Sequence, residues 1–284
     1  MNSTVTVFVH GAWHSSLHFV ATQGELARHG VPSIALDLPG HGLGAPAPSG
    51  YLLPGQPGLA TERSELADLT MDRIADDLLA SLAGIRPRFE RVVLVAHSAG
   101  GGPASAVAER APELVDQLVY LSAFLPAGRP RFLDYVSAPE NAGAVHVPTV
   151  GDPEVLGAFR INPLSADPAE VAAIQRSFLA DWPAQLPGWR LLLHPDEPLA
   201  SLLAPVQLTP ARWGRIPRTY IRLTDDLALP PATQDLMIAE ADRAVPDSPT
   251  EVHSLPGGHS PFLTRPAELA ELLATVAKSA AASV

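Results

Sequence analysis

Short apolar runs of strand length alternate along the chain with stretches whose apolar residues recur every three or four positions. The strand-like runs, rich in β-branched residues, are Val5–His10, Ser33–Asp37, Val92–Ala96, Leu118–Ser122, Arg218–Leu223 and Thr250–Leu255. The helical pattern covers Ser16–His29, Met71–Gly84, Ala99–Arg110, Ala232–Ala244 and Arg265–Lys278. Strands that are apolar on both faces and alternate with helices are typical of a parallel sheet covered on both sides. We therefore predict an α/β fold with a mostly parallel, doubly wound sheet.

One long segment, residues 126–215, interrupts this alternation. It has no comparable strand run, is dense in proline, and carries Trp182, Trp189 and Trp213. A structureless loop of that length is uncommon inside a domain, and tryptophan is costly to leave exposed. The pattern predicts an inserted, mainly helical cap at 126–215 on a core formed by 1–125 and 216–284. The alternative is a long proline-rich surface excursion. A second irregular stretch, Gly42–Glu65, is expected at the rim beside the cap.

The composition of the chain limits the kinds of partner that it is expected to bind. The chain has 284 residues, 46% of them hydrophobic, and a formal net charge of −11. Nucleic acid and anionic membrane surfaces require a basic face, so neither is expected as a partner. Cysteine is absent, which excludes disulfides, a thiol nucleophile and a thiolate metal site. The first residues lack the pattern of a secretory signal and no apolar run is long enough for a membrane span, so a cytoplasmic protein is expected. Symmetric dimers are common among soluble proteins, so the possibility that the chain forms a homodimer stays open.

The strand run Val92–Ala96 gives way at once to small residues around Ser98. The sequence Ala96-His97-Ser98-Ala99-Gly100 is a variant of the G-x-S-x-G nucleophile elbow, in which a strained strand-to-helix turn exposes one serine hydroxyl. Alanine stands where the first glycine is usual. Small residues around a serine are also frequent in ordinary packing, so the pentapeptide needs partners elsewhere in the chain.

Activation of a serine hydroxyl requires a base and a carboxylate that orients the base. His259 lies in a glycine-rich loop after the last strand run, at the edge where open parallel sheets place their sites. The preceding strand run ends in Asp225-Asp226, and the pattern does not choose between them. The backbone N–H groups of Ala12, in the turn after the first strand, and Ala99 can converge to stabilise a negative oxygen. Taken singly, each residue is equally well explained by an ordinary turn or a solvated loop.

Four features thus follow one another along the chain, each at the end of a strand: the turn that carries Ala12, the serine, the acid and the histidine. This order resembles the α/β-hydrolase family over essentially the whole chain. The motifs HGAWH at His10–His14, DLPGHG at Asp37–Gly42 and T-x-D at Thr224–Asp226, followed by Pro230 and Gln234, are similar to one branch of that family. The branch contains plant methylesterases, hydroxynitrile lyases and many bacterial esterases. Its acid is the third residue of T-x-D, so the resemblance implies Asp226.

The resemblance implies a carboxylesterase-like serine hydrolase with the triad Ser98, Asp226 and His259, a chemistry that needs no cofactor and no metal. Hydroxynitrile lyases of the branch carry a threonine and a lysine where this chain has Gly11 and Ser260, so cyanohydrin cleavage is disfavoured. Two other readings stay open. One is a lyase, cyclase or acyl transferase on the same scaffold, and the other is a catalytically silent protein that binds a small ligand.

Aromatic residues near the motifs and in the cap predict an apolar pocket, because ligand pockets are lined mainly by such side chains. The candidates are Trp13, Phe124, Trp182, Trp189, Trp213 and Phe262. The expected substrate is a small, largely apolar ester, lactone or thioester. His14 and His18 have the spacing of a helical metal pair but no third ligand, so they are expected on a solvated helix face. His97 is expected to pack or to form a hydrogen bond behind the site.

Overall fold

A computed structural model describes residues 4–183 and 185–282 of the chain. Within these residues, six strands form one sheet in the order β2-β1-β3-β4-β7-β8, and every neighbouring pair is parallel. The strands are β1 (Thr4–Val9), β2 (Ser33–Leu36), β3 (Arg91–His97), β4 (Gln117–Leu121), β7 (Arg218–Leu223) and β8 (Glu251–Leu255). The strand order changes direction after β2, as in a doubly wound sheet. The predicted α/β class is confirmed.

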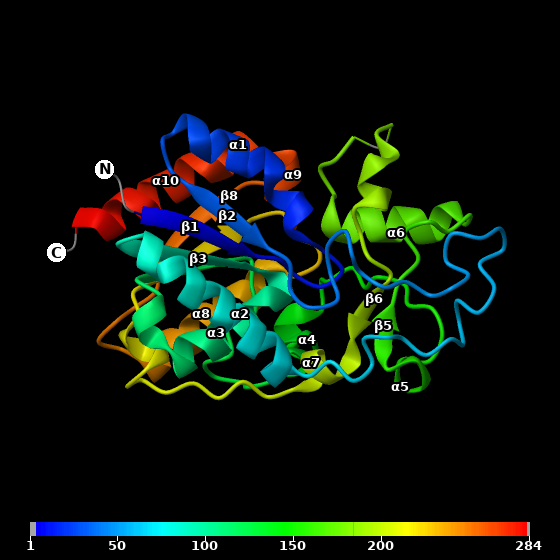
Figure 1. Cartoon of the computed structure of the whole chain (residues 1–284), viewed down its shortest axis with the longest axis horizontal. Coiled ribbons are helices and arrows are strands. Elements are labelled where there is room, and N and C mark those ends of the chain that lie inside the picture. Colours follow the sequence, from blue (N-terminus) through cyan, green and yellow to red (C-terminus); the bar gives the residue numbers. More distant parts are fainter. Residues whose placement is uncertain (1–3, 184, 283–284) are drawn as a thin grey trace.

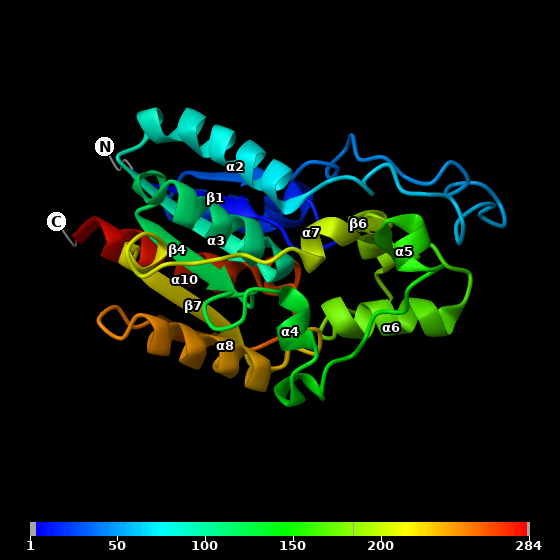
Figure 2. The same cartoon turned by 90° about the horizontal axis from the view of Figure 1, so that it is seen from below.

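Long helices cover both faces of the sheet (Figure 1). One face is covered by α1 (Val20–Arg28) and α10 (Pro266–Ala282), and the other by α2 (Met71–Ile85), α3 (Gly101–Arg110) and α8 (Pro231–Ala244) (Figure 2). Successive strand residues point to opposite faces. In β3, Leu94 accordingly joins the apolar cluster under α2 and α3, whereas Val93 and Val95 join the cluster under α1 and α10. This explains why the strand runs are apolar without alternation.

The segment between β4 and β7, residues 126–215, is called the inserted segment below. It contains α4 (Phe132–Val136), α5 (Pro153–Leu156), α6 (Pro168–Phe178) and α7 (Leu199–Leu203), and a small antiparallel sheet of β5 (Ala158–Arg160) and β6 (Asp196–Pro198). Most of it lies beyond the carboxyl ends of the central strands (Figures 1 and 2). The small sheet was not predicted.

Short helices complete the described structure. They are η1 (Ser16–Phe19), η2 (Arg86–Arg88), η3 (Ser98–Gly100), η4 (Pro112–Leu114), η5 (Pro139–Asn141), η6 (Pro187–Leu191), η7 (Trp213–Arg215) and α9 (Pro261–Thr264). In the described part of the chain, no helix is long and apolar enough to cross a bilayer.

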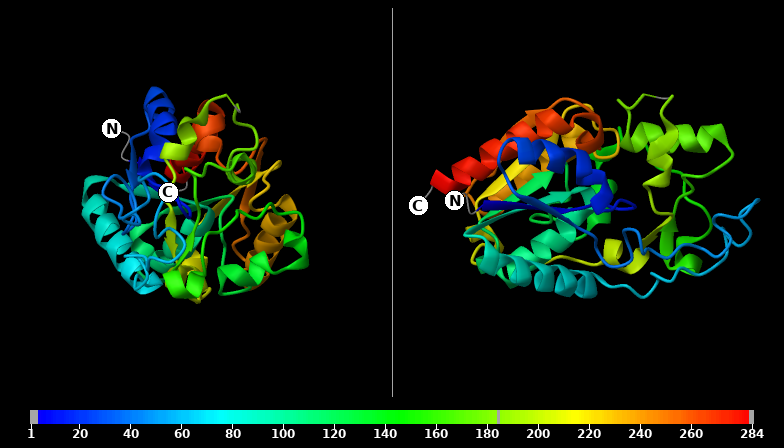
Figure 3. Two further views of the ribbon diagram at one scale, coloured as in Figure 1. Left: turned by 90° about the vertical axis from the view of Figure 1, so that its right-hand side faces the viewer. Right: turned by 45° about the horizontal axis from the view of Figure 1, so that its top comes forward.

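The irregular stretch Gly42–Glu65 runs alongside the inserted segment (Figure 3, right). Its backbone is held there by Arg160 of β5, whose guanidinium donates to the carbonyl oxygens of Leu59 and Glu62 at 2.7 and 2.9 Å. Arg160 is fully buried and pairs with Asp196 of β6 through two hydrogen bonds of 2.5 and 2.7 Å. The stretch and the inserted segment therefore form one packed unit beside the sheet edge.

Candidate active site

Ser98 stands at the turn between β3 and the helical residues that follow. Its φ of 51° lies in the left-handed region, which a residue with a side chain adopts only when its surroundings hold it there. The neighbouring backbone comes very close: a Cβ on Gly11 would lie 2.6 Å from the Cβ of Ser98, and one on Gly100 would lie 2.3 Å from the carbonyl oxygen of His10. Only glycine fits at these two positions. The methyl group of Ala96, in contrast, lies within the apolar core, where it is accommodated.

His259 follows β8 and Asp226 follows β7, so the parallel strands bring both to the same edge of the sheet. His259 Nδ1 lies 2.7 Å from Asp226 Oδ2, and both side chains are almost completely buried. Asp225 is exposed, and its carboxylate accepts the backbone N–H of Gly257 instead. The structure therefore places Asp226, and not Asp225, against the histidine.

Three further donors hold the carboxylate of Asp226. Ser122 Oγ donates to Oδ2 at 2.6 Å, and the backbone N–H groups of Ala228 and Leu229 donate to Oδ1 at 2.8 and 2.9 Å. Ser122 lies just after β4 with a φ of 37°. It was not singled out from the sequence, because a serine at a strand end carries no distinguishing pattern.

His97 lies behind His259. Its Nε2 is 2.9 Å from the backbone carbonyl oxygen of His259, and the two ring centroids are 4.6 Å apart. Complete burial and the nearby His259 ring hold the pKa of His97 well below its ordinary value. The ring is therefore neutral, and its Nε2–H donates to the carbonyl oxygen. This contact fixes the backbone of the loop that carries His259.

Ser98 and His259 line one cavity of about 230 Å³, together with Ala12 and Ala99. The opposite wall comes largely from the inserted segment and includes Phe132, Leu133, Val136, Val145, Val147, Phe159, Phe178 and Leu202. Among the described residues that line the cavity there is no Asp, Glu, Lys or Arg. Ser98 and His259 thus face a mostly apolar chamber, whose other polar lining residues include Asn141, His146 and Thr149.

The model of the alpha/beta hydrolase family matches residues 6–272 of the chain. The chain belongs to the α/β-hydrolase family. Its relatives include a pyrethroid hydrolase of Sphingobium wenxiniae, 29% identical over 99% of this chain and 90% of that protein. Another is putative methylesterase 12 of Arabidopsis thaliana, 24% identical over 96% of this chain and 71% of that protein.

Among solved structures, the pyrethroid hydrolase of Sphingobium faniae JZ-2 superposes with a TM-score of 0.70 at 26% identity, covering 98% of both chains. A variant of tomato methylketone synthase I gives a TM-score of 0.74 at 20% identity, covering 99% of this chain and all of the other. The second likeness shows the fold alone. The named esterases among the relatives support a carboxylic ester hydrolase.

In this α/β hydrolase, the structure brings only one of the six predicted pocket aromatics, Trp13, into the cavity wall. Trp213 corrects the prediction most plainly: it is buried in the core, where its indole N–H donates to Tyr120 Oη at 2.9 Å and Arg218 stacks on its ring. The reason is that residues 204–212 leave the site and run back along α3, where Thr209 binds Glu109.

The other four aromatics also lie outside the lining of the cavity. Phe124 packs edge-on against Phe132 and Tyr135, and Phe262 packs against the ring of His97. Trp182 and Trp189 belong to the small apolar cluster of the inserted segment. Apolar side chains fill a core as readily as a pocket, and the sequence does not distinguish the two destinations. Besides Trp13, the cavity is lined by Phe132, Phe159 and Phe178, which were not among the predicted pocket residues.

His14 and His18 are buried in the hydrolase, so their predicted place on a solvated helix face is wrong. Burial lowers the pKa of His14 to about 3 and that of His18 well below its ordinary value. Their Nδ1 atoms lie near local backbone groups, 2.7 Å from the carbonyl oxygen of Ala12 for His14 and 3.1 Å from the N–H of Ser15 for His18. Within the described residues, no group of three or more potential ligands is arranged to hold a metal ion.

Proposed function

We propose that this protein hydrolyses carboxylic esters of small, neutral, largely apolar substrates through an acyl-enzyme on Ser98. One observation carries the proposal: the imidazole that is hydrogen-bonded to Asp226 lines the same cavity as the strained serine. An imidazole oriented by a carboxylate is the general base that a serine nucleophile requires.

In the proposed reaction, Ser98 Oγ attacks the ester carbonyl carbon while His259 takes the serine proton. Asp226 holds His259 with Nδ1 protonated, so Nε2 is the basic nitrogen. The backbone N–H groups of Ala12 and Ala99 stabilise the oxygen that becomes negative. His259 then returns the proton to the departing alcohol. In the second half, His259 takes a proton from water as the water oxygen attacks the acyl carbon. The bond between the acyl carbon and Ser98 Oγ then breaks, His259 returns the proton to Oγ, and the acid leaves.

The substrate class follows from the cavity and the relatives. A chamber lined by apolar side chains and lacking charged residues favours neutral ligands, because an unpaired charge is costly to desolvate. The relatives described above, a pyrethroid hydrolase and a putative methylesterase, are named as hydrolases and esterases. We propose that the inserted segment acts as the cap that shapes this chamber, and that lactones and thioesters of similar size are also accepted.

The first prediction is that Ser98→Ala lowers kcat for p-nitrophenyl butyrate by about 10⁴-fold or more. The wild type should also be labelled by a fluorophosphonate probe, and Ser98→Ala should not. Ser105→Ala, which removes a buried serine of α3 that binds Tyr120, serves as the matched control and should keep both properties. Undiminished turnover by Ser98→Ala would refute the proposal.

Product analysis in H₂¹⁸O separates hydrolysis from the alternatives on this scaffold. A hydrolase places one solvent oxygen in the acid product, whereas a lyase or cyclase does not. A wild type that is neither labelled by the fluorophosphonate probe nor turns over any ester would instead support a silent binding protein.

A further inference from the structure

Trp13 is a strained residue next to the proposed oxyanion donor. Its φ of 60° lies in the left-handed region, where a bulky residue persists only if its surroundings fix it. It directly follows Ala12, and the peptide that joins the two residues sets the direction of the turn. The Ala12 N–H belongs to the preceding peptide, between Gly11 and Ala12, and the two peptides meet at the Cα atom of Ala12. Whatever holds Trp13 therefore also restrains the direction of that N–H.

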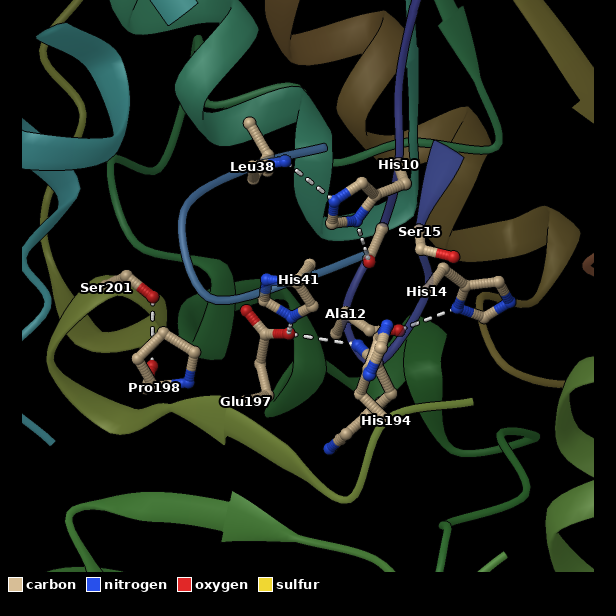
Figure 4. A network of polar contacts seen from close by, with 12 residues as sticks. His10, Ala12, His14, Ser15, Leu38, His41, His194, Glu197, Pro198 and Ser201 are labelled. Carbon is tan, nitrogen blue, oxygen red and sulfur yellow. Dashed lines mark hydrogen bonds and ion pairs between the residues drawn. The ribbon is translucent and has the colours of Figure 1, made fainter. Parts of the chain in front are cut away.

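Three hydrogen bonds hold Trp13, and all three come from the inserted segment. Its backbone N–H donates to Glu197 Oε2 at 2.9 Å (Figure 4), and its indole N–H donates to the carbonyl oxygen of Phe159 at 3.0 Å. Its own carbonyl oxygen accepts the N–H of His194 at 2.9 Å. Of these partners, Glu197 is the only charged side chain.

Glu197 is itself fixed by His41. The same oxygen, Oε2, lies 3.0 Å from His41 Nε2, and both side chains are more than nine-tenths buried. His41 Nδ1 lies 3.2 Å from the carbonyl oxygen of Pro39, so both ring nitrogens face acceptors. That geometry fits an imidazolium paired with a carboxylate.

The surroundings of His41 have opposing effects on its pKa. Burial opposes its charge, and the rings of His10 and His194 lie 4.8 and 5.6 Å away. Glu197 and Asp37 favour it, and the pKa of His41 is raised overall. His41 belongs to the DLPGHG stretch, which the proposed mechanism leaves without a role.

We propose that Glu197 is a positioning residue that reaches from β6 to the peptide between Ala12 and Trp13 and fixes the direction of the oxyanion donor. The pair of Glu197 with His41 anchors the carboxylate on the hydrolase core. This inference rests on the proposed function. Because an oxyanion donor acts on charge that develops only in the transition state, its displacement lowers kcat and leaves KM nearly unchanged.

The kinetic test compares Glu197→Ala, which removes the acceptor, with Glu197→Gln, which keeps an oxygen for the Trp13 N–H. We expect Glu197→Ala to lower kcat for p-nitrophenyl butyrate about 10- to 100-fold with KM changed less than about 3-fold. Glu197→Gln should keep most of kcat. The control is Glu154→Gln, a change at an exposed carboxylate of α5 in the inserted segment; its kcat should change less than about 3-fold.

A second measurement does not depend on activity. Hydrogen exchange of the Trp13 amide, followed in protein labelled with ¹⁵N-tryptophan and assigned with Trp13→Phe, should be about 10-fold faster in Glu197→Ala than in the wild type and Glu197→Gln. Unchanged exchange in Glu197→Ala overturns the inference, as does a kcat loss that Glu197→Gln or Glu154→Gln matches. If the wild type hydrolyses no ester, the proposed function fails, while the exchange rates still decide whether Glu197 holds the turn.

Discussion

At the scale of single residues, the carboxylate of Asp226 is the most highly connected group of the site. It accepts from Ser122, Ala228, Leu229 and the imidazole of His259. In Asp226→Asn, the amide N–H₂ group faces donors that it cannot accept from. The neutral amide also no longer stabilises the imidazolium that forms on His259 during the reaction. We expect Asp226→Asn to lower kcat by about 10⁴-fold at neutral pH.

Asp225→Asn is the matched control, because the neighbouring carboxylate is exposed and binds the backbone of Gly257. Its kcat should stay within about 3-fold of the wild type. Steady-state kinetics of both variants, with circular dichroism to verify folding, decides the assignment. The opposite ranking of the two variants would identify Asp225 as the acid.

These residues also show which parts of the site could be predicted from the sequence. Ser98 and His259 were predicted because strand ends of a parallel sheet converge. The pattern alone left Asp225 and Asp226 equivalent, since adjacent residues at a strand end differ only in where the turn points them. Ser122 and Glu197 could not be predicted, because their roles depend on contacts with residues 104 and 184 positions away.

At the scale of elements, the small sheet of β5 and β6 joins the inserted segment to the Gly42–Glu65 stretch. Arg160 is fully buried, and Asp196 is its only carboxylate partner among the described residues. Asp196→Asn leaves this guanidinium without a counter-charge. Removing one partner of a buried ion pair costs about 3–5 kcal/mol, so we expect a lower Tm in thermal unfolding.

Two further variants test whether the loss of stability comes from the unpaired charge of Arg160. Replacing both partners, as Arg160→Met with Asp196→Leu, removes the unpaired charge and should recover part of the lost stability. Asp68→Asn breaks the exposed pair with Arg63 and should leave Tm nearly unchanged. An equal effect of the buried and the exposed change would show that the Arg160 pair does not anchor the stretch.

The elements that the sequence predicted and those it missed differ in their apolar content. The central strands were located to within one or two residues, and in β1, β3, β4 and β7 the reason is that both faces of the strand enter the core. β5 and β6 have three residues each, and β6 reads Asp196-Glu197-Pro198. Such a strand has no apolar alternation to detect, and a pair of buried charges takes the place of an apolar core.

At the scale of the whole molecule, four buried histidines and the half-buried His194 are held neutral. Burial is the largest cause in each, lowering the pKa of His14 to about 3, that of His194 to about 4, and those of the other three well below the ordinary value of 6.5. The other three are His10, His18 and His97. His41 differs, since its pKa is raised.

The sign of the pH dependence follows from proton uptake. Below pH 6.5, the unfolded chain binds protons at the five histidines and the folded protein does not, so stability falls as the pH falls. His41 contributes stability that is complete below pH 6.5 and is lost as the pH rises through its raised pKa. The free energy of unfolding is therefore expected to be greatest near pH 6.5.

Each histidine that stays neutral in the folded protein contributes at most about 1.4 kcal/mol per pH unit below pH 6.5, and the half-buried His194 contributes less than the four buried ones. We therefore expect the free energy of unfolding to fall from pH 6.5 to pH 5. Urea unfolding measured between these two pH values gives the slope, and His194→Gln should reduce it. His146→Gln, a change at an exposed side chain, is the control and should leave the slope unchanged. A slope corresponding to one proton or fewer would show that these histidines are not held neutral in the folded protein.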